Sequence, residues 1–198
     1  IFDIMTLADT GSEMYNFAVV TKDETKEKLS LAGPASYPTV SVISPELQAT
    51  VTNDYLAYSA SDIFAHSLDM YLSATYMPAY MAGYVENILK TVMRTTGILL
   101  KDPGHYEARA EFAWAATQAL NFTTFCGVEN NRYDTHFLEH TLSAEYDIAH
   151  GAGLSVIMPA WMHWQKKNLP ERFEQFAKNM FNVSGADACI EALKQWYK

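Results

Sequence analysis

His136-Phe-Leu-Glu-His140-Thr-Leu-Ser-Ala-Glu-Tyr-Asp-Ile-Ala-His150-Gly is the most informative stretch of this chain, because it holds three of the six histidines. An upstream stretch, Asp62-Ile-Phe-Ala-His66, places an acid one helical turn before another histidine. Residues four apart on an α-helix project from one face, and both stretches otherwise have the apolar residues of core helices. Two such helices can direct a carboxylate and several imidazoles at one divalent ion.

A single histidine on an apolar helix is more often a hydrogen-bonded core residue than a metal ligand. The clustering argues differently here, because burying several imidazoles and a carboxylate together is costly unless something satisfies them. A bound cation does so most simply. A purely structural metal site is the alternative, but structural zinc usually recruits thiolates, and neither Cys126 nor Cys189 is spaced to supply one.

The composition is that of a globular protein, with 49% hydrophobic and 13% aromatic residues among 198. A net charge of −9, with scattered Lys and Arg, argues against binding to nucleic acid or to an anionic membrane. No apolar run is long enough to span a bilayer, and the start does not resemble a signal peptide. We therefore expect a soluble, cytoplasmic protein in which both cysteines are small buried hydrophobes.

The periodicity predicts a mainly α fold in which a β-rich segment, residues 1–45, precedes an all-helical segment, residues 46–198. Strands are expected at 17–21 and 28–31, as a hairpin, and at 39–43. The helices are expected over 55–73, 78–100, 106–123, 132–144, 154–164, 170–181 and 186–198. The Ala- and aromatic-rich helix 106–123 is expected at the centre of the domain. Gly151 and Gly153 indicate a break just after His150.

The chemistry of the candidate site suits a transition metal. One carboxylate and three imidazoles favour Fe²⁺ or Zn²⁺, whereas Mg²⁺ and Ca²⁺ prefer shells of oxygen atoms. Such an ion polarises a substrate oxygen. The loop Thr6-Leu-Ala-Asp-Thr-Gly-Ser-Glu13 is a second, weaker signal. A loop of small hydroxyl residues at the carboxyl end of a strand is where an α/β domain positions a cofactor or substrate.

Together these segments resemble the iron-containing (group III) alcohol dehydrogenases. The resemblance runs from about residue 5 to at least residue 165. It rests on the loop Thr6–Glu13, on Ser44-Pro-Glu-Leu47, on the Asp62 and His66 pair, and on His136-x-x-x-His140 followed by Ala149-His150-Gly151. The wording Leu-Ala-Asp-Thr-Gly-Ser-Glu-Met and Thr-His-Phe-Leu-Glu-His is similar to the butanol dehydrogenase branch.

The resemblance implies two domains with the metal in the cleft between them. Residues 1–45 would be the C-terminal part of a nucleotide-binding α/β domain, and 46–198 an all-helical catalytic domain truncated at its C-terminus. The metal ligands that it implies are Asp62, His66, His136 and His150. His140 would lie near the metal without binding it, so we predict a role in proton transfer or in orienting other groups. Thr6, Lys28 and Leu47 would contact NAD(P)H through its phosphates or ribose, a ribose hydroxyl and apolar packing, respectively.

The activity that the resemblance implies is the NAD(P)H-dependent interconversion of a primary alcohol and an aldehyde, in a homo-oligomer. The family's glycine-rich phosphate-binding turn has no match in this chain, and Asp9 and Ser44 replace a glycine and an acidic residue of the family. We therefore expect a fragment that binds metal but is inactive by itself. Two alternatives stay open: a metal-dependent hydrolase on a helical bundle, and a non-catalytic domain stabilised by metal.

Overall fold

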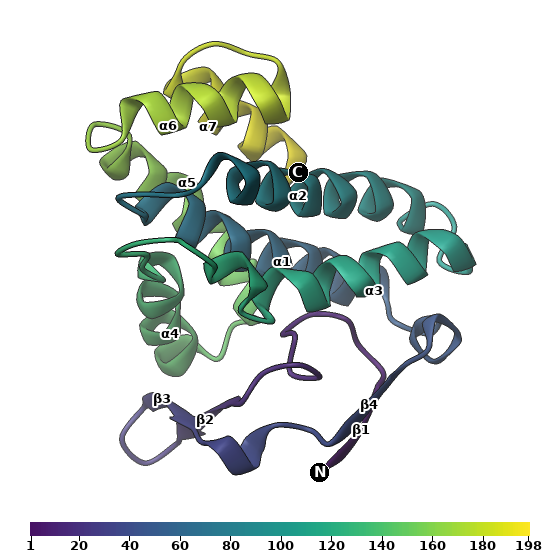
Figure 1. The fold of residues 1–198 in the computed structure, drawn as a ribbon. Helices are drawn as coiled ribbons and strands as arrows, with labels where there is room; N and C mark the ends of the chain where they lie inside the picture. The colour runs from purple at the N-terminus through teal and green to yellow at the C-terminus, as the bar shows by residue number, and fades with distance from the viewer.

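The computed structural model describes residues 1–198. Its N-terminal part forms two separate strand pairs along one side of the helices (Figure 1). β1, Phe2–Met5, pairs in parallel with β4, Val40–Ile43. β2, Phe17–Lys22, and β3, Glu27–Ala32, form the expected antiparallel hairpin. Because β1 and β4 run parallel, the segments that follow them leave from the same end of the pair.

Seven α-helices make up the rest of the chain (Figure 1). They are α1 Asn53–Ser73, α2 Ala79–Leu99, α3 Tyr106–Leu120, α4 Asp134–Tyr146, α5 His150–Gln165, α6 Pro170–Phe176 and α7 Ala186–Trp196. A π-helical segment, Ala177–Phe181, continues α6. The predicted mainly α fold is therefore confirmed, and most helix ends lie within a few residues of the prediction.

α1 lies at the centre of the helical part, and its residues from Ser59 to Ser73 are buried without interruption. The expectation that the helix over 106–123 would occupy the centre is wrong. In α3 the side chain of Trp114 is 55% exposed, and Tyr106 is exposed as well. Ala residues cover the buried face of α3, whereas its large aromatic residues include some that face solvent, so its composition overstated its burial.

α1 contributes buried residues to two separate apolar clusters. One packs α1, through Phe64 and Leu68, against α2, α5, α6 and α7. The other packs α1, through Leu56 and Ile63, against α2 and α3, and it also includes Met5 at the end of β1. The strand pair of β1 and β4 is thereby anchored to the helices.

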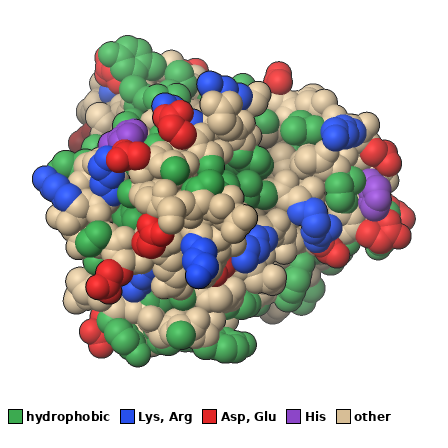
Figure 2. Space-filling view, turned by 90° about the horizontal axis from the view of Figure 1, so that it is seen from above, with side chains coloured by type: hydrophobic (Ala, Val, Ile, Leu, Met, Phe, Trp, Pro, Cys, Tyr) green, Lys and Arg blue, Asp and Glu red, His purple; other side chains and the backbone are tan.

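The solvent exposure of three side chains contradicts two further expectations. Cys126 is exposed, and only Cys189 is the small buried hydrophobe that we predicted. Phe137 and Leu138, which suggested a core helix, are 70% and 53% exposed on α4. On the face shown in Figure 2, Lys and Arg side chains lie scattered among Asp and Glu side chains. None of the helices combines the length and apolarity needed to cross a membrane.

Candidate metal centre

α1 supplies Asp62 and His66 from its buried stretch. The helix begins where Thr52 accepts a hydrogen bond from the backbone N–H of Tyr55 through its Oγ1 atom, at 3.4 Å. Asp62 and His66 are one turn apart, and both are almost completely buried, with exposures of 2% and 5%. Their side chains face the N-terminal ends of α4 and α5.

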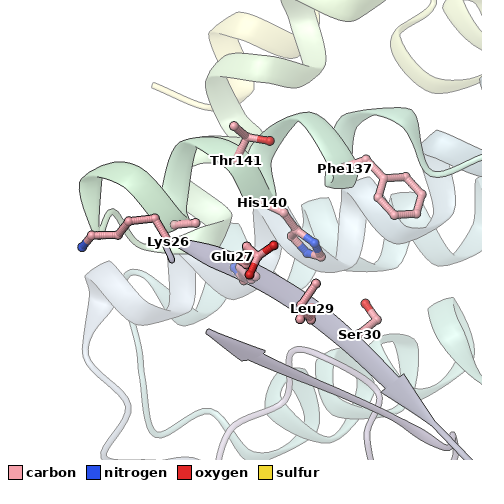
Figure 3. Close-up of a pocket in the computed structure, with 9 residues that line it drawn as sticks. Lys26, Glu27, Leu29, Ser30, Phe137, His140 and Thr141 are labelled. Carbon is pink, nitrogen blue, oxygen red and sulfur yellow. The ribbon is translucent and has the colours of Figure 1, made fainter. Parts of the chain in front are cut away.

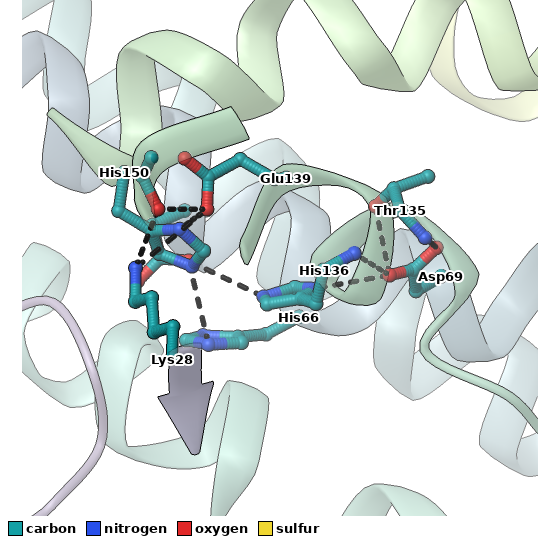
Figure 4. Close-up of polar contacts among 9 residues, drawn as sticks. Lys28, His66, Asp69, Thr135, His136, Glu139 and His150 are labelled. Carbon is teal, nitrogen blue, oxygen red and sulfur yellow. Dashed lines mark hydrogen bonds and ion pairs between the residues drawn. The ribbon is translucent and has the colours of Figure 1, made fainter. Parts of the chain in front are cut away.

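α4 begins at a carboxylate of α1, and the same carboxylate orients a histidine (Figure 4). Asp69 accepts hydrogen bonds from the backbone N–H groups of Thr135 and His136, at 3.2 and 3.3 Å, and from Thr135 Oγ1 at 2.8 Å. It also lies 2.8 Å from Nδ1 of His136. With Nδ1 held in this way, Nε2 of His136 is directed at Asp62.

α5 begins at His150, and the break expected after this residue is absent. Gly151 and Gly153 instead lie in the first turn of α5. A Cβ atom on Gly151 would lie 2.0 Å from the backbone oxygen of Tyr58 in α1, and one on Gly153 would lie 2.6 Å from Oε1 of Glu139 in α4. The glycines therefore allow α5 to approach both helices closely enough to bring His150 into the site.

The four predicted ligands converge on one carboxylate oxygen. The distances from Asp62 Oδ1 to Nε2 are 3.5 Å for His66, 3.3 Å for His136 and 3.5 Å for His150. Potential ligand atoms of Asp62, His66 and His136 all lie within 4.8 Å of one another. Asp62 Oδ1 and His136 Nε2 are buried and make no hydrogen bond. Buried polar atoms without partners are rare in proteins, and a cation among these four side chains would satisfy both atoms.

The charges around this oxygen also suit a cation. Burial opposes ionisation of Asp62, but His66 and the other nearby imidazoles outweigh burial and lower the pKa of this carboxyl well below its ordinary value. Burial lowers the pKa of His66 to about 3. Burial also acts to lower the pKa of His136, but the carboxylates of Asp62 and Asp69 outweigh burial and raise this pKa to about 9. Near neutral pH the site thus holds an ionised carboxylate, a neutral His66 and a protonated His136. A cation that binds here must displace the proton of His136, because only the neutral imidazole is a metal ligand.

His140 and Lys28 border the site from α4 and β3. His140 lines a cavity of about 420 Å³ between these two elements and projects toward β3 (Figure 3). Burial, followed by the charge of Lys28, lowers the pKa of His140 to about 4, so its imidazole is neutral near pH 7. Lys28 Nζ donates a hydrogen bond of 2.9 Å to Ser143 Oγ and lies 3.8 Å from Oε2 of Glu139.

Thr6 and Leu47 are exposed and lie just after β1 and β4, at the same end of that strand pair. The loop between Thr6 and Glu13 packs on α3, because Thr117 donates a hydrogen bond to the buried carboxylate of Glu13. Ser41 Oγ of β4 donates to the backbone oxygen of Glu13 at 2.8 Å. The positions of Thr6 and Leu47 at one edge are compatible with a shared ligand, and their predicted contacts with the nucleotide stay predictions.

Two acids beside the histidines, Asp69 and Glu139, were missed by the sequence analysis. Both are 0% exposed, and each lies against Nδ1 of a predicted ligand, Asp69 at His136 and Glu139 at His150. Asp69 lies two turns after Asp62 on the same face of α1, which was an available signal. Glu139 carried none, because nothing in the sequence separates it from Glu145 and Asp147, two acids of the same segment that are exposed.

The chain matches a known family over most of its length. A family model described as "Fe-containing alcohol dehydrogenase family, C-terminal" matches residues 56–198. NADH-dependent butanol dehydrogenase B of Clostridium acetobutylicum is 37% identical over 94% of this chain and 47% of that protein. NADPH-dependent aldehyde reductase YqhD of Escherichia coli is 28% identical over 98% of this chain and 52% of that protein.

A solved structure shows the same likeness. The crystal structure of NADH-dependent butanol dehydrogenase A from Thermotoga maritima matches with a TM-score of 0.95 and 41% identity, over 100% of this chain and 50% of that one. The chain therefore spans about half the length of the relatives it matches.

Proposed function

This chain belongs to the iron-containing alcohol dehydrogenase family, and we propose that it forms the metal-binding part of an NAD(P)-dependent oxidoreductase that interconverts a primary alcohol and an aldehyde. One observation carries the proposal. A buried aspartate oxygen lies 3.3–3.5 Å from three imidazole nitrogens supplied by three helices. The relatives named above are dehydrogenases or reductases of alcohols and aldehydes, which supports the same activity here.

We propose Asp62, His66, His136 and His150 as the ligands of one Fe²⁺ or Zn²⁺ ion. The donor set fits either ion, since it combines one carboxylate with three imidazoles. When bound, the ion supplies Lewis-acid polarisation of a substrate oxygen, and the nicotinamide nucleotide supplies the redox equivalent. The protein's own contribution is to hold these four side chains in position before substrate arrives, because their helices meet at this point.

His140 is the proposed group for proton transfer. Its imidazole lines the cavity between β3 and α4 beside the proposed metal ligand His150, with ring centroids 5.3 Å apart. The ring is neutral near pH 7 and so has a free nitrogen for a proton, but its lowered pKa makes it a weak base that passes the proton on. We propose that Lys28, which lies at the same cavity, hydrogen-bonds a ribose hydroxyl of the nucleotide. Thr6 and Leu47 would contact the same cofactor from the end of the strand pair. The partners that we propose are a small alcohol or aldehyde and further copies of the chain, in the cytoplasm.

Cofactor dependence tests the proposal. The natural polypeptide that carries this chain is purified, loaded with Fe²⁺ or Zn²⁺, and mixed with a series of primary alcohols and NAD⁺ or NADP⁺. We expect reduced nicotinamide to form, and we expect His140→Ala to lower kcat strongly while metal content is retained. An exposed histidine on α5, His163, gives the matched control: His163→Ala should leave kcat unchanged.

The same preparations distinguish the dehydrogenase from the two alternatives, a metal-dependent hydrolase and a non-catalytic domain stabilised by metal. Hydrolysis of phosphate esters with metal, without oxidation of any primary alcohol, would establish the metal-dependent hydrolase instead. If His140→Ala left turnover untouched, His140 would have no part in proton transfer. Metal binding without either activity in the natural polypeptide would favour a domain that metal only stabilises.

A further inference from the structure

Glu139 has no part in the function proposed above, yet its side chain is fully buried next to a proposed metal ligand. Its Oε2 atom accepts a hydrogen bond from Nδ1 of His150. The other ring nitrogen of His150, Nε2, lies 3.5 Å from Asp62 Oδ1. A histidine that binds metal through one nitrogen commonly donates its other N–H to a carboxylate, which fixes the tautomer and the ring orientation.

We propose that Glu139 is the positioning residue that holds His150 in the tautomer and orientation needed to bind the metal. This inference rests on the metal site of the proposed function and names a residue outside its ligand set. Glu139 acts through His150, because its contact is with Nδ1 and not with the nitrogen that faces Asp62. The hydrogen bond to a carboxylate also makes His150 a more basic ligand.

The carboxylate is fixed by groups from three elements (Figure 4). Besides His150 of α5, Ser143 Oγ of α4 donates to Glu139 Oε2 at 3.3 Å, and Lys28 Nζ of β3 lies 3.8 Å away. The other oxygen, Oε1, is buried and has no hydrogen-bond partner. All the interactions therefore converge on the one oxygen that contacts His150, which is what a positioning role requires.

Gly153 provides the space in which this carboxylate lies. A Cβ atom there would approach Glu139 Oε1 to 2.6 Å and Cγ to 2.7 Å, so an added methyl group would push the flexible end of Glu139 aside. The room on α5 for this side chain depends on the absence of a Cβ atom. Substitution at Gly153 thus tests the position of the carboxylate without removing it.

Asp69 makes the corresponding contact with His136, at 2.8 Å from Nδ1. Two of the three proposed imidazole ligands therefore have a carboxylate at the ring nitrogen that faces away from the site. His66 lacks such a partner, since its Nδ1 is buried without a hydrogen bond. Asp69 also caps α4, so its replacement would disturb the helix; Glu139 caps nothing, which makes it the cleaner position for a test.

The experiment measures Zn²⁺ binding by calorimetric titration to the purified natural polypeptide that carries this chain, unmodified or with one substitution. Glu139→Met removes the acceptor at similar size, and we expect it to weaken Zn²⁺ binding by about 10- to 100-fold. Glu139→Gln keeps an oxygen that accepts from Nδ1–H and should recover part of this loss. Glu145→Gln, at an exposed acid of the same helix, is the matched control and should bind Zn²⁺ as the unmodified chain does.

Gly153→Ala separates positioning from folding. Alanine favours the helical conformation over glycine, so helix content measured by circular dichroism should be retained. Zn²⁺ affinity should nevertheless fall, because the carboxylate is displaced from His150. Side-chain nitrogen-15 spectra of the Zn²⁺-loaded chain give an independent readout: we expect His150 protonated at Nδ1, with this signal lost or shifted in Glu139→Met.

The outcomes distinguish failure of this inference from failure of the metal site. If the unmodified chain binds one Zn²⁺ and Glu139→Met and Gly153→Ala bind it equally well, Glu139 does not position His150. Two Zn²⁺ ions in the unmodified chain, one of them lost in Glu139→Met, would make Glu139 a ligand and overturn the inference. If the unmodified chain binds no Zn²⁺ or Fe²⁺, the proposed metal site itself fails.

Discussion

Asp62 is the residue on which the site depends, because its Oδ1 atom is the point shared by the three imidazoles. Asp62→Asn keeps the size of the side chain but removes its charge. Replacing a residue that hydrogen-bonds a metal ligand typically weakens metal binding by about 10- to 100-fold. We expect replacement of the ligand itself to weaken it at least as much. Metal content after gel filtration measures this loss, and His150→Ala should behave alike. Asp54→Asn, at an exposed acid in the first turn of α1, is the control; equal metal in all of these chains would remove the ligand assignment.

Glu13 gives a pH dependence of stability. This side chain is 4% exposed, and burial raises its pKa above the ordinary value of 4.5. A carboxyl whose pKa is raised by folding stabilises the fold below its unfolded pKa, and this stability is lost as pH rises through the folded pKa. Near neutral pH the buried charge therefore destabilises the fold. Glu13→Gln, which keeps an acceptor for Thr117, should raise Tm there, and the gain should shrink below pH 4.5.

The control for this prediction is Glu24→Gln, at an exposed residue of the turn between β2 and β3. It should leave Tm nearly unchanged across the same pH range. A gain for Glu13→Gln of the same size at acidic and neutral pH would contradict the electrostatic cause.

At the residue scale, the sequence was sufficient for the ligand candidates but not for their partners. The clustering of acid and imidazole side chains on helices indicated the site, and the family resemblance selected Asp62, His66, His136 and His150 as its ligands. The structure brings all four together. Their role as ligands stays a prediction. Glu139 could not be found, since its burial depends on the packing of α5 against α4, which no local pattern encodes.

Among the elements, α5 makes the most demanding contact. Its first turn passes so close to α1 that a Cβ atom at Gly151 would lie 2.0 Å from the backbone oxygen of Tyr58. Because backbone cannot move aside as a side chain can, Gly151→Ala should destabilise the fold by about 1–3 kcal/mol and also weaken metal binding. Denaturant unfolding and metal titration measure the two effects.

Gly83→Ala is the matched control for this substitution. Gly83 lies in α2 and is exposed, and a Cβ atom added there would meet nothing within 4 Å outside its own helix. Alanine there should stabilise the chain by about 0.5–1 kcal/mol, since glycine is the poorer helix former. If both substitutions stabilised, the close approach of α5 to α1 would be refuted.

Helical periodicity predicted the helices well where an apolar stripe faces a core. The apolar stripe of α2 includes Met81, Val85, Ile88 and Val92, and all four are buried. The start of α5 was missed for a physical reason: Gly151 and Gly153 are typical of a break in local sequence, but here they serve close contact between helices. Tertiary packing, which the sequence pattern does not contain, decided the outcome.

In the molecule as a whole, the proposed ion would join the middle of α1 to the first turns of α4 and α5. Removing it with a chelator should lower Tm, because a ligand that binds only the folded chain stabilises it. Free Zn²⁺ at one hundred times its dissociation constant would contribute about 2.7 kcal/mol. Calorimetric melting with and without chelator measures the effect. Asp62→Asn should show no such dependence, and an equal shift in this variant would point to metal bound elsewhere.

At the scale of the whole chain, the sequence was sufficient to predict which part forms strands and which part forms helices. Composition and periodicity separated a β-rich beginning from an all-helical remainder, and the hairpin of β2 and β3 was found from its strands. The order of burial was not predictable, since α1 became the central helix and α3 did not. Which helix is enclosed depends on how many others pack around it, and that number is a property of the complete fold.

The hydrogen bonds of Asp69 link the proposed metal site to two backbone N–H groups at the start of α4. One carboxylate holds the N–H groups of Thr135 and His136 as well as the imidazole of His136, so the start of α4 and the aim of that ring share a single anchor. An ion that immobilises the ring must also immobilise those two peptide groups. Their protons should therefore exchange with deuterium more slowly once metal is bound, and mass spectrometry of this short segment would read occupancy directly.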